Sequence, residues 1–149
     1  MRLPIRAMAA TAAFAAAFTA VFAAAGPAAA AARAAPEVPA QVSAVATGGE
    51  WTSPKGSGVL RVVIADEGFE HVHSRLWIEW LATSERGAPR RVARVFVKEL
   101  SNGMAVLRPG DPREVFQRDR IRLRATHTYS QDISDITIEA GTPGHYRLP

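Results

Sequence analysis

The sequence predicts an all-β protein: a small antiparallel β-sandwich of the immunoglobulin-like type with about six or seven strands, preceded by a cleavable signal peptide. Three observations support this prediction. Short runs of Val, Ile and Leu alternate with polar residues through the second half of the chain. Gly and Pro separate these runs at regular intervals. The chain opens with a positively charged start and a long alanine-rich apolar run.

Residues 1–30 have the three parts of a secretory signal peptide. Two arginines supply the positive start, residues 7–25 form the apolar run, and small residues precede a cleavage site that we place after Ala30. Alanine fills the neighbouring positions, so the cut can fall anywhere between residues 25 and 35. An uncleaved membrane anchor and a mitochondrial presequence are the alternatives. The leader predicts a periplasmic or secreted protein that crosses the membrane without keeping a stable transmembrane segment.

The net charge of +4 belongs mostly to this leader. The first 35 residues hold three arginines and no acidic residue, which leaves 15 basic and 14 acidic side chains in the rest of the chain. A nearly neutral domain gives no electrostatic reason to expect a nucleic-acid partner. The chain has no cysteine, which excludes disulfide bonds, thiol catalysis and thiolate metal ligands.

Residues 31–49 are expected to form a flexible, extended lead-in, because they contain Pro and Gly and show no sustained hydrophobic period. Gly48 and Gly49 mark the expected edge of the folded part. A single β-sandwich domain is placed at residues 50–149.

Within this domain, alternating or continuous apolar runs predict the strands, in chain order: residues 59–66, 75–81, 91–100, 103–108, 120–126 and 135–140, with a short closing strand at 146–148. The run at 75–81 carries large side chains on both faces, so it is expected to be a central strand.

Two segments leave the secondary structure open. Residues 91–100 also fit helical spacing, as do residues 75–81, although the three valines of the first segment favour a strand. Asp111, Pro112 and Glu114 form a pattern typical of a helix start, which predicts one helical turn at 112–117.

The runs at 120–126 and 135–140 predict an antiparallel hairpin. The expected register sets Leu123 opposite Ile138 and Ala125 opposite Ile136 on the inner face, with Arg122 opposite Glu139 outside. A slip by one residue would set apolar side chains against arginines.

His71 and His73 are the candidate metal ligands. Residues two apart on a strand point to the same side, so both imidazoles could bind one copper or zinc ion. The alternative is that one histidine is packed and the other solvated, because the sequence supplies no third ligand at a diagnostic spacing.

The candidate binding residues are four arginines at alternate positions, Arg118, Arg120, Arg122 and Arg124, together with Trp77. Guanidinium groups on one strand face suit phosphate, an acidic glycan or an acidic protein surface. The alternative is a solvent face neutralised by nearby acidic residues. Trp77 and Trp80 lie on opposite faces of their strand, so one of them either binds a partner or is covered by a second layer.

No motif indicates a catalytic serine, a catalytic cysteine or a phosphate-binding glycine loop. We therefore expect a non-enzymatic binding or interaction module with no cofactor, which binds a protein or an acidic ligand of unknown identity. A periplasmic metal-binding protein that uses His71 and His73 is the first alternative, and a small hydrolase is the second.

Overall fold

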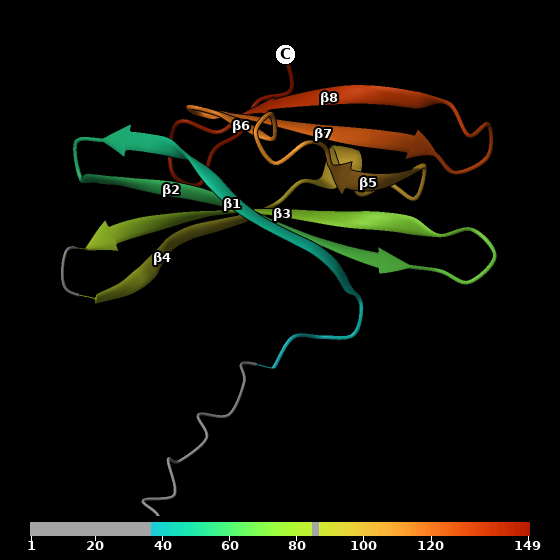
Figure 1. The fold of residues 1–149 in the computed structure, drawn as a ribbon, viewed down its shortest axis with the longest axis horizontal. Helices are drawn as coiled ribbons and strands as arrows, with labels where there is room; N and C mark the ends of the chain where they lie inside the picture. Colours follow the sequence, from blue (N-terminus) through green and yellow to red (C-terminus); the bar gives the residue numbers. More distant parts are fainter. Residues whose placement is uncertain (1–36, 85–86) are drawn as a thin grey trace, which may run out of the picture. The chain divides into compact units, whose positions relative to one another are not determined.

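The computed structural model describes residues 37–84 and 87–149, so the predicted signal peptide and the first residues of the predicted lead-in lie outside the described residues. Within the described part, eight strands form two antiparallel sheets (Figure 1). Sheet A contains β1 (Val42–Ser53), β2 (Gly56–Glu67), β3 (His73–Ser84) and β4 (Gly87–Phe96). Sheet B contains β5 (Ala105–Pro109), β6 (Phe116–Gln117), β7 (Arg120–His127) and β8 (Ile133–Glu139). A short 3-10 helix, η1 (Lys98–Leu100), lies between the last strand of sheet A and the first of sheet B.

The strands of sheet A follow one another in chain order, whereas β7 is the centre of sheet B. β8 pairs with one edge of β7, and β5 and β6 pair with successive parts of the other edge. The all-β antiparallel prediction is confirmed, and β3, between β2 and β4, has the predicted central place. Residues 146–148 contribute one isolated bridge, between Arg147 and Glu139, instead of a strand.

The immunoglobulin-like connectivity is not observed. In that fold the third strand of the chain belongs to the second sheet, whereas here the first four strands share one sheet. At most five residues separate each of these strands from the next, which favours pairing between chain neighbours.

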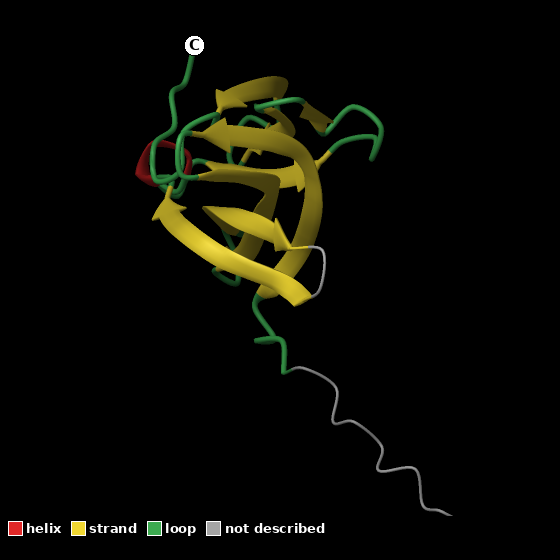
Figure 2. Ribbon diagram, turned by 90° about the vertical axis from the view of Figure 1, so that its left-hand side faces the viewer, coloured by secondary structure: helices red, strands yellow, loops and turns green. Residues whose placement is uncertain are grey.

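Apolar side chains from the facing sides of the two sheets form one shared core. Figure 2 shows the strands of both sheets around this interior. Because side chains alternate along a strand, the core takes every second residue of the most regular strands: Leu60, Val62 and Ile64 from β2, Leu76, Ile78 and Trp80 from β3, and Ile121, Leu123 and Ala125 from β7. The predicted inward positions on β7 are confirmed.

Trp80 joins the two sheets by a directional contact as well as by its volume. Its ring is fully buried, and its Nε1–H donates a hydrogen bond of 2.7 Å to the carbonyl oxygen of Ala140, just after β8. A buried indole N–H needs such an acceptor, because an unpaired one costs free energy. The bond therefore fixes how the end of β8 lies over the middle of β3.

A polar network joins the sheets at a second place. The buried Ser74 on β3 donates to Oδ1 of Asp66 at 2.7 Å and accepts from the backbone N–H of Leu107 at 2.8 Å. Arg108, on β5, donates to both carboxylate oxygens of Asp66, at 3.0 and 2.5 Å. β2, β3 and β5 are thus held together by bonds in which the hydroxyl of Ser74 is both donor and acceptor.

The predicted flexible lead-in is corrected for residues 42–49, which form most of strand β1. β1 pairs with β2, and its register is irregular at the two glycines. Gly49 has a φ of +61°, and a Cβ atom there would lie 2.4 Å from the carbonyl oxygen of Arg118. The N–H of Glu50 donates to that same oxygen at 2.8 Å. The glycine pair therefore forms a bulge that brings β1 against the β6–β7 turn, and does not mark a domain edge.

Two helical alternatives are also settled. The segment 91–100 is a strand in its first part and η1 at its end. No helix forms at 112–117, where Asp111 instead closes one turn: its carboxylate accepts from the N–H of Arg113 at 2.8 Å and its carbonyl from that of Val115 at 3.0 Å. The next residues join sheet B as β6, because pairing with β7 satisfies their backbone groups better than a helix of one turn would.

The hairpin of β7 and β8 is confirmed, with the register shifted by two residues. Leu123 lies opposite Ile136 instead of Ile138, so every side chain keeps its predicted face. The N–H of His127 donates to the carbonyl oxygen of Asp132 at 2.8 Å. This bond closes a tighter loop than the predicted register assumed.

Replacing Trp80 with Phe should lower the free energy of unfolding by about 2–4 kcal/mol, because the change removes buried ring volume and leaves the carbonyl of Ala140 without its donor. The matched change on the outer face of the same strand, Trp77→Phe, should cost less than about 1 kcal/mol. Urea denaturation followed by circular dichroism measures both. Equal losses in the two variants would contradict the role given to Trp80.

Gly49→Ala should destabilise the fold by about 3 kcal/mol, because it combines a left-handed backbone with a clash against Arg118. Gly103→Ala is the control: its φ is +87°, but no atom lies within 4 Å of the added methyl group. We expect a loss of about 1 kcal/mol for the control in the same denaturation assay. Similar losses would mean that the close approach of β1 to the β6–β7 turn is not required.

Candidate functional site

The side of sheet A that faces away from sheet B carries one buried carboxylate among arginines. Glu79, on the central strand β3, is 2% exposed. Arg61, on β2, donates from Nε to its Oε2 at 2.6 Å, and Arg91, on β4, donates from Nη1 to its Oε1 at 2.9 Å. Nε of Arg94, also on β4, lies 3.6 Å from Oε1. The register explains this grouping, because Glu79 is directly opposite Arg61 on one side and Arg94 on the other.

The arginines keep Glu79 ionised although it is covered. Burial acts to raise the pKa of Glu79, but the hydrogen bonds from Arg91 and Arg61 and the positive charges of Arg61 and Arg94 outweigh burial, so the pKa lies below its ordinary value of 4.5. One negative charge against three positive charges leaves the cluster net positive. The side chains of Arg61, Arg91 and Arg94 are 36%, 52% and 43% exposed. N–H donors that Glu79 does not use can therefore bind a second anion.

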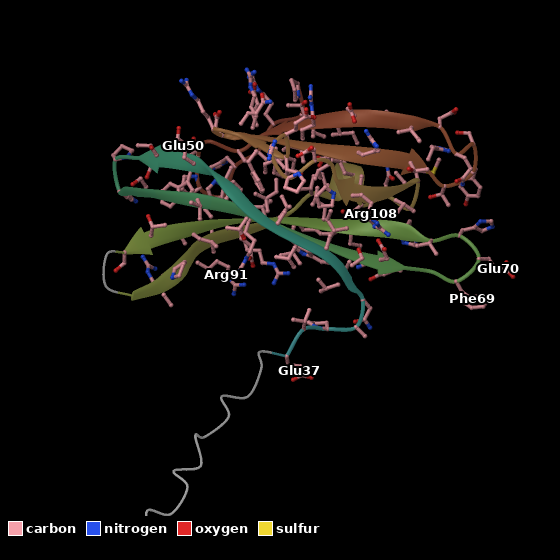
Figure 3. The ribbon with its side chains drawn as sticks, in the orientation of Figure 1. Glu37, Glu50, Phe69, Glu70, Arg91 and Arg108 are labelled. Atoms are coloured by element: carbon pink, nitrogen blue, oxygen red, sulfur yellow. The ribbon has the colours of Figure 1, made fainter. Side chains whose placement is uncertain are left out.

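Trp77 and Phe96 extend the same side of the sheet. They are opposite each other in the β3–β4 register, with ring centroids 5.4 Å apart. The guanidinium of Arg94 lies 5.2 Å from the centroid of the Trp77 ring, within cation–π range. Trp77 is half-buried and Phe96 is 39% exposed. We call these six residues the arginine–aromatic face: Arg61, Trp77, Glu79, Arg91, Arg94 and Phe96. Arg91 is labelled in Figure 3.

The predicted arginine ladder lies in the other sheet. Arg120, Arg122 and Arg124 are exposed on β7, as the alternation predicts. Arg118 does not share this strand face, because it lies in the β6–β7 turn with a φ of 55°. Each of the three strand arginines has a carboxylate within 4.0 Å, in order Glu139, Glu114 and Asp135. Such exposed pairs contribute about 0–1 kcal/mol each, but they neutralise the ladder.

The predicted binding residues therefore do not form one surface, since Trp77 belongs to sheet A and the ladder to sheet B. The sequence shows Arg91 and Arg94 as part of a basic stretch, but sequence reasoning missed that they meet Arg61 around Glu79, because these residues come from strands that are far apart in the chain. The position of Glu79 could have indicated the cluster. An acidic residue in the middle of a predicted central strand needs cationic partners from the neighbouring strands.

Within the described residues, the two candidate metal-ligating histidines are not joined by a third ligand. His71, in the β2–β3 loop, packs its ring 5.1 Å from that of Tyr129, and Nδ1 of His73 lies 3.3 Å from the carbonyl oxygen of His71. The nearby carboxylates of Asp66 and Glu67 are paired with arginines. Across residues 37–84 and 87–149, no group of three His, Cys, Asp or Glu side chains is placed to hold a metal ion.

A serine, a histidine and an aspartate meet in the β7–β8 loop. Nδ1 of His127 lies 3.1 Å from Oγ of Ser130, but the serine hydroxyl donates to Asp132 at 2.6 Å. The backbone N–H of Ser130 also donates to Nδ1 of His127 at 3.2 Å. A catalytic triad needs the carboxylate to orient the histidine and the histidine to accept from the serine. This arrangement instead satisfies the polar groups of a loop.

Comparisons with protein-family models, with characterised proteins and with solved structures found no match to this chain. None of the helices in the described residues is both long and apolar enough to cross a membrane.

Glu79→Gln should lower the free energy of unfolding at neutral pH by about 1.5–3 kcal/mol, because it removes charge-assisted hydrogen bonds and leaves three arginines side by side. The folded-state pKa of Glu79 is lowered, so its stabilisation is complete above the ordinary value of 4.5 and is lost as pH falls through the folded-state pKa. The difference between wild type and variant should therefore shrink below about pH 4.5. Urea denaturation over a series of pH values measures it.

Glu114→Gln serves as the control, because Glu114 is exposed and lies 4.0 Å from its partner Arg122. We expect a change of less than about 1 kcal/mol at every pH. A pH-independent difference for Glu79→Gln would contradict the assignment of an ionised Glu79.

Proposed function

We propose that this protein is an exported, non-enzymatic binding module whose arginine–aromatic face binds an acidic surface of another protein. The observation that carries the proposal is the excess positive charge around Glu79: three partly exposed guanidinium groups share one buried carboxylate. Carboxylates of a partner can accept the remaining N–H donors, singly or as bidentate pairs.

A protein partner fits this face better than a small anion does. Arg and Trp are the residue types that most often dominate binding at protein–protein interfaces, and here Arg94 lies against the ring of Trp77. Glu79 holds Arg61 and Arg91 by hydrogen bonds. These two side chains are therefore ordered before a partner binds, which lowers the conformational entropy lost on binding. Phe96 offers apolar area beside the charged groups.

The leader supports the export part of the proposal. Residues 1–30 have the composition of a signal peptide, and the absence of cysteine means that the domain needs no disulfide bond in a periplasmic or extracellular compartment. Fractionation of cells, with mass measurement of the N-terminus, tests this part: a chain that begins between residues 26 and 36 outside the cytoplasm supports it, and an intact cytoplasmic chain contradicts it.

The double variant Arg91→Gln/Arg94→Gln should lose capture of its partner, because it removes two positive charges from the face while Arg61 still pairs with Glu79. The assay is affinity capture from the exported fraction, with the captured protein identified and its affinity measured by titration. We expect at least about a 10-fold weaker affinity, which corresponds to about 1.4 kcal/mol.

The matched control is Arg122→Gln/Arg124→Gln, which makes the same change of charge on sheet B. It should bind the partner as the wild type does. Loss of capture by the control, with retention by the sheet A variant, would assign the binding site to the ladder instead. Thermal unfolding of both variants checks that the fold is intact.

A further inference from the structure

A cleft of about 580 Å³ opens at the end of the domain where β1 turns into β2. Small or aromatic side chains of sheet A, among them Trp51, Ala82 and Ala93, line one part of it, and Lys55, Arg90 and His145 supply its polar groups. No Asp or Glu lines the cleft within the described residues. Such a cavity suits an apolar group that carries negative charge at its edge.

The walls of this cleft are held by the fold. Trp51 is 3% exposed, and its Nε1–H donates to the carbonyl oxygen of Leu81 at 3.3 Å, which fixes the indole against β3. Ala82 and Ala93 are too small to fill the space between the sheets. A turn closed by the N–H of His145, which donates to the carbonyl oxygen of Thr142 at 3.0 Å, forms the opposite wall. Hydrogen bonds of the fold therefore hold two parts of the cleft wall in place.

The loop between β2 and β3 presents the complementary shape. Phe69 is 96% exposed at its tip, which is unusual for so large an apolar side chain. Glu67 and Glu70 lie on either side of it in the chain. Gly68, with a φ of +93°, allows the sharp turn that holds this residue outward. Figure 3 labels Phe69 and Glu70 at this tip, away from the core.

The loop and the cleft lie at opposite ends of one strand. The cleft includes the turn that precedes β2, and the loop follows β2 directly. β2 has 12 residues, and a strand of that length spans about 40 Å. Phe69 therefore cannot reach the cleft of its own domain, because the β1–β2 turn and the β2–β3 loop lie at opposite ends of the sheet (Figure 1).

We infer that this protein associates with copies of itself, head to tail, by inserting Phe69 of one molecule into the cleft of the next. The phenyl ring fills the apolar part beside Trp51, and the carboxylate of Glu70 meets the positive charges of Lys55 and Arg90. The contact joins two different surfaces, so a row of molecules keeps one free loop at one end and one free cleft at the other. A loop in a cleft is a small interface, below about 1,200 Å², so association is expected at high protein concentration.

This inference is independent of the proposed function, because it uses no residue of the arginine–aromatic face. The double variant Arg91→Gln/Arg94→Gln should therefore associate as the wild type does. Failure of partner capture and failure of self-association can be observed separately.

Sedimentation velocity of the purified protein over a concentration series tests the inference. The weight-average mass of the wild type should rise with concentration and reach at least about twice the monomer mass near 1 mM. Phe69→Ser should stay monomeric, and its exposed position means that the fold is unaffected. Lys55→Glu/Arg90→Glu, which reverses the charge at the cleft, should also stay monomeric.

Mixing these two variants is the decisive step. Phe69→Ser keeps only a working cleft, and Lys55→Glu/Arg90→Glu keeps only a working loop. The mixture should therefore form dimers and nothing larger. Ile133→Ser is the matched control for Phe69→Ser, because Ile133 is 66% exposed on another element; it should associate as the wild type does. A monomeric wild type, association of Phe69→Ser, loss of association in the control, or a mixture that stays monomeric would each overturn the inference.

Discussion

The hydrogen bond from Trp80 to the carbonyl of Ala140 is the interaction on which the arrangement of the two sheets depends. Apolar burial alone has no direction, so it would allow the sheets to slide over one another. The buried indole N–H admits only positions in which it meets an acceptor, and the end of β8 supplies one. The network of Ser74, Asp66 and Arg108 joins the two sheets at a second place.

The two sheets carry charge in different ways, although both contain several arginines. In sheet B each strand arginine lies within 4.0 Å of a different carboxylate, and one of these carboxylates, Glu139, also pairs with Arg147. In sheet A three arginines converge on Glu79, and positive charge remains after that carboxylate is counted. A chain whose described domain has almost equal numbers of acidic and basic residues can thus still have one distinctly basic side. Whether a surface can bind an anion therefore depends on how many carboxylates pair with its arginines, and not on the total charge of the chain.

Much of this fold could be predicted from local patterns, and the failures share a physical cause. Apolar runs predicted β2, β3, β7 and β8, and alternation predicted the buried faces of β7 and β8, because burial of one side of a strand leaves a period of two. The strand β1 was missed because its glycines, required by the approach to Arg118, resemble a linker in sequence. The register of the β7–β8 hairpin depended on loop hydrogen bonds that no side-chain pattern records. The site around Glu79 was missed for the same reason: its members meet only after β2, β3 and β4 have paired.

The meander order of sheet A has a consequence for the kinetics of folding. Its four strands are consecutive in the chain and separated by at most five residues, so their hairpins form by closing small loops, which costs little conformational entropy. The bond between Trp80 and Ala140 instead joins residues 60 positions apart. Sheet A is therefore expected to assemble first, with the apolar side of β3 open to water until the last strand arrives. During that interval a nascent molecule offers its core side to other chains, and the speed with which the C-terminal strands arrive decides between folding and aggregation.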